Sequence, residues 1–431
     1  MKRVSIAMVM ILMIQGLWAQ DKAQETTIEK GKTEEKKFGV KFSGFVKNDF
    51  FYDTRQTVAA REGHFLLWPT PENLDMNGND INAKASFNML AIQSRLSLAL
   101  KGPDALGAST SGLIEGDFFA QLNENINLFR LRHAFVKFSW THVELLAGQT
   151  WNPLFVTDCF PGTVSFNTGT PIQSFARNPQ IRVSYKTGGL KISAAALSQR
   201  DYASRGPEGA TSRYLSNSGI PDMHLQAQYA FKNESGTGFI AGAGLAYKTI
   251  VPRLSSEPVE GEVYKVNEKV GGLTAMGFSR LNTKPVTAKL QVRYGENIAD
   301  LLAISGFVVT DIIDPLTGQQ EYSPLKSMSY WAEVHSNGNP QVGIFGGYTV
   351  NNGSKDERSS TLNPVYGLGT NIRSLYRIAP RVIYNVGKVR LALECEYTSA
   401  AYGRDYDNFF IPSETISTGN MRFLLAVFYF F

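Results

Sequence analysis

The sequence is poor in cysteine and in long apolar runs. Cys159 and Cys395 are the only cysteines among 431 residues, so no disulfide framework can form. After Gln20, no stretch approaches the roughly eighteen consecutive apolar residues that a membrane-spanning helix needs. The formal net charge is only +5, and it falls by two if Lys2 and Arg3 are removed, which excludes a general affinity for nucleic acid.

The N-terminus has the pattern of a secretory signal peptide. Lys2 and Arg3 precede an apolar run that ends at Ile14, and Ala19 stands at a plausible cleavage point. A run of about eleven residues is too short to cross ~30 Å of hydrocarbon as a helix. We therefore expect residues 1–19 to be a signal peptide that directs the chain out of the cytoplasm.

The next segment, 20–37, is rich in charge and shows no apolar periodicity, which predicts a flexible polar tail in the periplasm. From residue 38 onward, apolar side chains recur at every second position. In 388–397, for example, Leu391 and Leu393 share one face while Glu394 and Glu396 share the other. Strands of about ten residues with one apolar and one charged face are typical of a membrane barrel with a wet interior.

Sixteen segments of this kind can be marked. They are 39–53, 86–100, 111–122, 128–138, 142–150, 179–187, 190–199, 222–231, 238–250, 269–281, 285–296, 327–336, 340–351, 371–385, 388–400 and 420–431. The connections between them are alternately short and mostly long, as in outer-membrane barrels, whose short turns are periplasmic. The sequence thus predicts an all-β fold over 38–431, a transmembrane antiparallel β-barrel of about sixteen strands with long extracellular loops.

The last segment ends in an aromatic residue. Phe423, Leu425 and Tyr429 alternate toward Phe431, a pattern that resembles the C-terminal assembly signal of outer-membrane barrels. We therefore expect Phe431 to be recognised by the barrel-assembly machinery, and the surface to contact outer-membrane lipid and lipopolysaccharide.

A barrel of sixteen strands is too wide for side chains to fill, so it should enclose an aqueous channel. The predicted pore-lining residues are Arg95, Arg130, Arg132, Arg182, Arg293, Arg373, Arg377, Arg381, Arg390, Glu115 and Asp117. The excess of guanidinium groups favours small anionic, carboxylate-type solutes, because each offers a planar fork of donors. The alternative is that these charges are solvated or paired with the acids, in which case the channel has no preference for anions.

The long connection 151–178 is unusually apolar for a loop, with Trp151, Phe160 and Phe175 among its aromatic residues. Such a loop is either packed into the barrel or buried at a subunit contact. If it forms a constriction, it brings Asp158, Gln173 and Arg177 near the channel axis.

The sequence resembles the DcaP-like trimeric porins. The matching segments are Gly44-Phe45-Val46-Lys47 with Tyr52-Asp53, Gln93-Ser94-Arg95-Leu96, Ile114-Glu115-Gly116-Asp117-Phe118-Phe119, Leu131-Arg132-His133-Ala134-Phe135, Leu146-Ala147-Gly148-Gln149-Thr150-Trp151 and Arg177-Asn178-Pro179-Gln180-Ile181-Arg182. The resemblance implies a sixteen-stranded barrel, a homotrimer, and uptake of small anionic solutes such as dicarboxylates. The segment 20–37 lacks the heptads of the longer N-terminal coiled coil that family members carry.

An outer-membrane enzyme would need a catalytic constellation, and we find no Cys/His ligand spacing, phosphate-binding glycine loop or nucleophile elbow. His133 falls on the predicted outward face of its strand, away from any lumen. We therefore predict no catalytic residue, no metal and no cofactor. The remaining alternative is a non-conducting barrel that acts as an adhesin or structural protein through its long loops.

Overall fold

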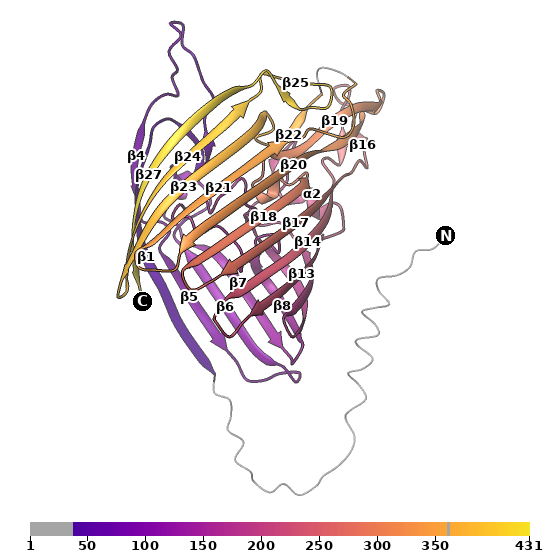
Figure 1. The fold of residues 1–431 in the computed structure, drawn as a ribbon. Coiled ribbons are helices and arrows are strands. Elements are labelled where there is room, and N and C mark those ends of the chain that lie inside the picture. Colours follow the sequence, from indigo (N-terminus) through magenta and orange to yellow (C-terminus); the bar gives the residue numbers. More distant parts are fainter. Residues whose placement is uncertain (1–37, 360–362) are drawn as a thin grey trace, which may run out of the picture. The chain divides into compact units, whose positions relative to one another are not determined.

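The computed structural model describes residues 38–359 and 363–431, and the predicted signal peptide and tail lie outside them. Within this range the main antiparallel sheet closes on itself (Figure 1), and four two-stranded sheets accompany it. The wall strands are β1 (Gly39–Asp53), β4 (Ser86–Leu90), β5 (Arg95–Lys101), β6 (Ser109–Asp117), β7 (Arg130–Ser139), β8 (Val143–Trp151), β9 (Arg177–Thr187), β10 (Leu190–Leu197), β13 (Asp222–Lys232), β14 (Gly238–Ile250), β17 (Val270–Asn282), β18 (Val286–Glu296), β20 (Gln319–Ser336), β21 (Gln341–Asn351), β23 (Ile372–Val386), β24 (Val389–Tyr402) and β27 (Ile416–Phe430).

The first and last strands close the barrel. β1 pairs with β27 from Phe45 opposite Phe430 to Asp53 opposite Arg422. On its other side β1 pairs with β4 and β5, which are the two halves of one interrupted strand. The sheet has nineteen strands; without β19 and β22, and with β4 and β5 taken together, the wall has sixteen. This confirms the predicted all-β barrel and its strand number.

Shorter elements lie between the wall strands. They are β2 (Thr57–Ala60), β3 (Phe65–Pro69), η2 (Asn123–Asn125), β11 (Arg205–Gly206), β12 (Gly209–Ala210), α2 (Arg213–Ser216), β15 (Ser255–Ser256), β16 (Tyr264–Lys265), η3 (Ala299–Leu301), β19 (Ser305–Asp314), β22 (Val365–Leu368), β25 (Asp405–Tyr406) and β26 (Pro412–Ser413). No helix in the described part of the chain is long and apolar enough to cross a membrane.

The outer face of the wall is apolar because the strand period of two sends alternate side chains outward. On β24, Leu391 and Leu393 are exposed on the outside, whereas Glu394 and Glu396 are buried on the inside. β23, β21, β14 and β13 repeat this division. Hydrocarbon accepts the first set of side chains, and closure of the sheet pairs the backbone groups of the wall strands, so the barrel can span a membrane.

The predicted strands and the observed ones agree closely, with local differences. The segments 39–53 and 238–250 are found as β1 and β14 with the predicted limits. The predicted strand 86–100 is interrupted between Leu90 and Arg95.

The prediction that His133 faces outward is wrong. Between β6 and β7 the register shifts, so that Glu115 lies opposite His133 and Gly116 opposite Leu131. This β-bulge places both Arg132 and His133 on the inner face, and the alternation restarts one residue out of phase. Phe135, which the alternation placed outside with Leu131, consequently lines the lumen.

The barrel interior holds a packed core made largely of connections. The segment 152–176 between β8 and β9, here called the constriction loop, contributes Leu154, Phe155, Phe166 and Phe175 to it. The β2–β3 hairpin adds Phe65 and Trp68, so two loops remote in sequence pack together inside the wall. Phe65 contacts both Phe166 and Phe175, with ring centroids 5.2 Å apart in each case. The core therefore occupies part of the barrel interior.

Candidate pore constriction

Three carboxylates on the inner wall hold the constriction loop. Glu394 accepts hydrogen bonds from the backbone N–H groups of Val164 at 2.6 Å and Ser165 at 2.9 Å. Glu396, two residues further along the same face of β24, accepts two from the Asn167 side-chain amide, at 2.9 and 3.1 Å. On β20, Glu333 accepts the backbone N–H of Gly162. These hydrogen bonds satisfy buried backbone and amide N–H groups of the loop, so they fix the loop against the wall opposite its ends.

Cations on other wall strands donate to the carbonyl groups of the same loop. Lys47 Nζ lies 3.2 Å from the carbonyl oxygen of Val164, and Lys289 Nζ lies 3.0 Å from that of Phe160. Arg280 donates to the carbonyl of Asp158 at 2.8 Å. Loop carbonyl groups buried away from water need such partners. The loop is therefore held from several sides of the barrel by side chains of both signs.

Neutral contacts complete the attachment. The Trp331 indole N–H donates to the Gln173 side chain at 2.8 Å, and the Cys159 thiol donates to the carbonyl of Ser279 at 3.2 Å. Burial raises the pKa of Cys159 to about 11, so the thiol stays neutral and keeps its proton for this bond.

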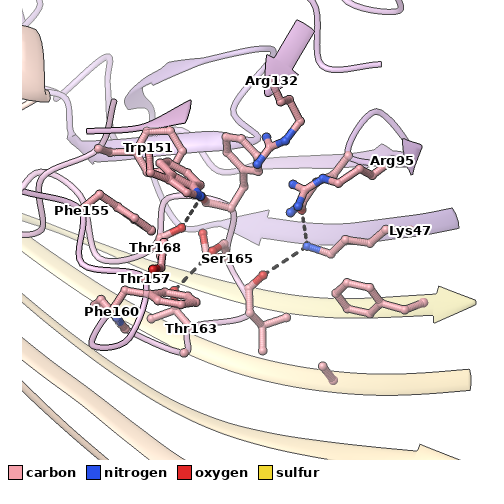
Figure 2. A pocket seen from close by; sticks show the side chains of 18 of the residues that line it. Lys47, Arg95, Arg132, Trp151, Phe155, Thr157, Phe160, Thr163, Ser165 and Thr168 are labelled. Atoms are coloured by element: carbon pink, nitrogen blue, oxygen red, sulfur yellow. Dashed lines mark hydrogen bonds between the residues drawn. The ribbon is translucent and has the colours of Figure 1, made fainter. Parts of the chain in front are cut away.

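A cavity of about 750 Å³ lies between the constriction loop and the wall (Figure 2). On one side Lys47, Arg95 and Arg132 point toward the loop, and on the other side lie Trp151, the last residue of β8, and Phe160 of the loop. The lysines and arginines that line this cavity are Lys47, Arg95, Arg132, Lys289, Arg381 and Arg390, and its only carboxylate-bearing lining residue among the described ones is Glu115. Acids behind the lining pair with several of these cations: Asp49 lies 3.0 Å from Lys47, and Glu333 lies 3.4 Å from Lys289 and 2.8 Å from Arg381.

The predicted pore-lining residues near the start of β7 form an ion-pair cluster. Arg132 contacts Glu115 and Asp117 at 2.8 Å each, and Arg130 contacts Asp117 at 2.8 Å. Arg95 is further from the same acids, at 3.6 Å from Glu115 and 3.9 Å from Asp117, and its side chain is 20% exposed. Arg130 is thus committed to the wall, whereas Arg132 and Arg95 also line the cavity, with Arg95 held less closely by the acids.

Three other predicted arginines serve the wall or the loop. Arg377 is fully buried, lies 3.2 Å from Glu396, and donates to the carbonyl groups of Thr170 and Leu67. Arg293 is also buried and donates to the Ser174 hydroxyl at 2.6 Å. Arg373 donates to the carbonyl of Asn351. These three side chains therefore link wall strands to the segments inside the barrel or to a neighbouring wall strand.

The remaining predicted residues occupy different places. Arg381 lines the cavity but is paired with Glu333 at 2.8 Å. Arg390 lines the cavity beneath the rings of Phe428 and Phe430 and, among the described residues, makes no ion pair. Arg182 donates to the Trp151 carbonyl at 2.7 Å and to the Gln180 side chain.

The residues predicted for the constriction also separate. Asp158 accepts a hydrogen bond from Gln228 at 3.2 Å, and Gln173 is buried against Trp331. Arg177 is fully buried and pairs with Asp201 at 2.6 Å. Among the predicted residues, Arg95, Arg132, Arg381, Arg390 and Glu115 converge on the cavity, and the others do not.

The sequence pattern did not identify two charged residues that contact the constriction loop. One is Lys47, whose ammonium group donates to the Val164 carbonyl of the constriction loop. Lys47 and Asp49 are two residues apart on an alternating strand, so their side chains share one face. Two charges on the same face were the indication that this face points inward. Glu333 was also missed, although it carries four contacts, to Gly162, Lys289, His335 and Arg381.

Comparison with solved structures defines the class of fold. The outer-membrane channel DcaP of Acinetobacter baumannii superimposes with a TM-score of 0.64 at 15% identity, covering 91% of this chain and 97% of that one. The anion-selective porin from Comamonas acidovorans gives 0.51 at 11% identity, covering 92% and 100%. The trimeric form of OmpT, an outer-membrane protein of Vibrio cholerae, gives 0.50 at 9% identity, covering 91% and 99%.

No protein-family model and no curated protein matches the sequence. The predicted resemblance to the DcaP-like porins is confirmed at the level of the fold. A closed antiparallel barrel of this type with an apolar outer face is an outer-membrane protein, as the sequence predicted.

Proposed function

We propose that this protein is an outer-membrane porin through which small hydrophilic anions of the carboxylate type diffuse passively. The observation that carries the proposal is the cavity beside the constriction loop, whose lining holds six lysines and arginines and one carboxylate. A narrow passage with an excess of fixed positive charge raises the local concentration of anions and repels cations. The barrel fold, similar to that of known porins, supports a channel.

The cavity wall offers two kinds of cation. Four of the six are paired with acids: Lys47 with Asp49, Lys289 and Arg381 with Glu333, and Arg132 with Glu115. Arg390 has no acidic partner among the described residues. Arg95 lies 3.6 Å from Glu115 and 3.9 Å from Asp117, further than the closely paired cations lie from their acids. We therefore assign the anion preference mainly to Arg95 and Arg390, and a structural role to Arg377 and Arg293. The proposal includes a homotrimer, assembly through Phe431, and no catalytic activity.

Single-channel recording in planar bilayers tests the proposal. Under a salt gradient, we expect stepwise openings, often in threes, and a reversal potential of the sign that anion selectivity produces. Open channels that prefer cations would support the pore but contradict the assignment of an anion preference to Arg95 and Arg390. A correctly folded barrel that conducts nothing would contradict the porin and favour an adhesin or structural role for the loops.

A further inference from the structure

Three phenylalanine side chains meet on the inner face of the wall where the first and last strands close the barrel. Phe45 on β1 lies opposite Phe430 on β27, and Phe428 is two residues before Phe430 on the same face. The ring centroids of Phe45 lie 5.7 Å from that of Phe428 and 5.8 Å from that of Phe430, and the rings of Phe428 and Phe430 are nearly parallel. We call these three residues the seam platform.

The strand pattern places the seam platform inside the barrel. Phe45 is two residues before Lys47, and both Lys47 and Phe428 line the cavity beside the constriction loop, here called the lumen cavity. On β27 the alternate residues Leu425 and Tyr429 are exposed on the outside. The three platform rings are only partly buried, so side chains from neighbouring strands can reach their faces.

Two arginines from the flanking strands lie on the platform. Arg95 on β5 lies opposite Phe45, and its guanidinium carbon is 5.1 Å from the centre of that ring. Arg390 on β24 lies opposite Phe428, and its guanidinium carbon is 5.7 Å from that ring and 5.3 Å from the ring of Phe430. Separations below about 6 Å are those of a cation–π contact. Across the neighbouring strands β5, β1, β27 and β24, phenyl rings therefore stand between two guanidinium groups.

These two arginines are also the cations of the lumen cavity that acids hold least. Arg95 lies 3.6 Å from Glu115 and 3.9 Å from Asp117. Arg390 makes no ion pair among the described residues, and its Nε donates to the Asn385 side chain at 2.8 Å. A guanidinium group on a ring face keeps N–H groups at its edge available to a carboxylate. The cations on the platform are therefore the ones that an anion in the lumen can reach.

The ring of Phe45 competes with Glu115 for Arg95. A cation–π contact and a partly exposed ion pair are of similar strength, so the ring can hold the guanidinium group short of close contact with the acid. Arg132, whose guanidinium carbon is 5.9 Å from its nearest ring, that of Trp151, lies 2.8 Å from the same Glu115. The contact with Phe45 thus accounts for the looser pairing of Arg95.

We propose that Phe45, Phe428 and Phe430 are positioning residues for anion selectivity, which hold Arg95 and Arg390 as cations available to anions in the lumen. Phe45 keeps Arg95 from closing on its acids, and the two rings on β27 restrict the long side chain of Arg390 to the inner wall. A carboxylate that passes along the seam then meets two guanidinium groups in place of two closed ion pairs. This inference rests on the proposed porin function and deepens it, because it names what keeps these two cations available.

Reversal potentials of the purified full-length protein in planar bilayers, recorded under a salt gradient, test the seam platform. We expect Phe45→Leu to lower the anion-to-cation permeability ratio about twofold or more, because leucine is apolar but offers no ring face. Phe45→Tyr keeps the ring face and should restore the ratio. In an Arg95→Gln background, Phe45→Leu should have no further effect. Phe423→Leu, on the exposed outer face of β27, is the matched control and should leave the ratio unchanged.

Equal ratios for Phe45→Leu and the unchanged protein would overturn the proposal. A loss that Phe45→Tyr does not restore, or that keeps its size in the Arg95→Gln background, would also overturn it, because packing and not the ring face would then be responsible. Only folded, inserted barrels give a reversal potential, and if Phe45→Leu does not fold, Phe428→Leu with Phe428→Tyr makes the same test on Arg390.

The same recordings separate this inference from the porin proposal. An unchanged protein without anion preference would contradict the proposed function. An anion-selective protein whose ratio is insensitive to the loss of the platform rings would contradict only the positioning role of the seam platform.

Discussion

Glu394 Oε1 accepts a hydrogen bond from the backbone N–H of Ser165 at 2.9 Å, joining the wall strand β24 to a loop that leaves the wall between β8 and β9. With the neighbouring bond to Val164, it fixes two successive amides to one buried carboxylate. The position of the constriction loop is thus set by the far wall of the barrel as well as by its own ends.

Weakening this attachment should increase the exposure of the loop. In a Cys395→Ser background, Cys159 is the only thiol and is fully buried. We expect Glu394→Gln to speed its alkylation by a maleimide about tenfold, because glutamine keeps only one of the two acceptor oxygens and losing one hydrogen bond lowers the free energy of local opening by about 1.5 kcal/mol. Glu296→Gln is the control, since Glu296 accepts a backbone N–H from Leu273 on the wall. An unchanged labelling rate would mean that Glu394 does not hold the loop.

Anion preference should depend on the least paired cations of the lumen cavity. Replacing Arg95 and Arg390 together by glutamine should lower the anion-to-cation permeability ratio about severalfold, since two fixed charges leave a cavity lined by six. The reversal potential under a salt gradient measures this ratio. Lys265→Gln, on the exposed β16 outside the cavity, should leave it unchanged. A ratio equal to that of the unchanged protein would rule out the assignment of these arginines.

Arg377 should affect stability more than selectivity. Its replacement by methionine leaves the buried Glu396 without its 3.2 Å partner and removes donors to the Thr170 and Leu67 carbonyl groups. We expect the free energy of unfolding to fall by about 3–5 kcal/mol, the usual cost of removing one member of a buried ion pair and leaving the other unpaired. Denaturant unfolding followed by heat-modified mobility on gels measures the loss. Adding Glu396→Gln should restore part of it; a change in selectivity with no loss of stability would contradict the structural role.

Deleting Phe431 should reduce assembly. The Phe431 ring stacks on Phe42 with centroids 5.6 Å apart, and its backbone N–H donates to the Gly44 carbonyl at 3.2 Å, so the residue helps close the barrel seam. We expect a lower amount of folded barrel in outer-membrane fractions. Tyr429→Ala, which leaves the terminal residue in place, should assemble better than the deletion. Equal amounts of the two variants would argue against recognition of Phe431.

The strand pattern was readable from the sequence because its cause is local. Alternation of Leu391 and Leu393 with Glu394 and Glu396 needs only the period of an extended chain and the contrast between hydrocarbon and water. The same reasoning placed Arg377 and Arg381 on an inner face, where the structure has them buried. The number of strands and the all-β fold followed from this rule.

The tertiary structure alone decided which inner charges are free. A bulge between β6 and β7 turned His133 and Phe135 inward, and strand period cannot reveal an inserted residue. Arg377 and Arg390 both lie at inward positions of alternating strands. Arg377 is bound by Glu396 and a loop carbonyl group, whereas Arg390 faces the cavity. Pairing across a barrel depends on which strands and loops meet, and that information lies in contacts between residues far apart in the chain.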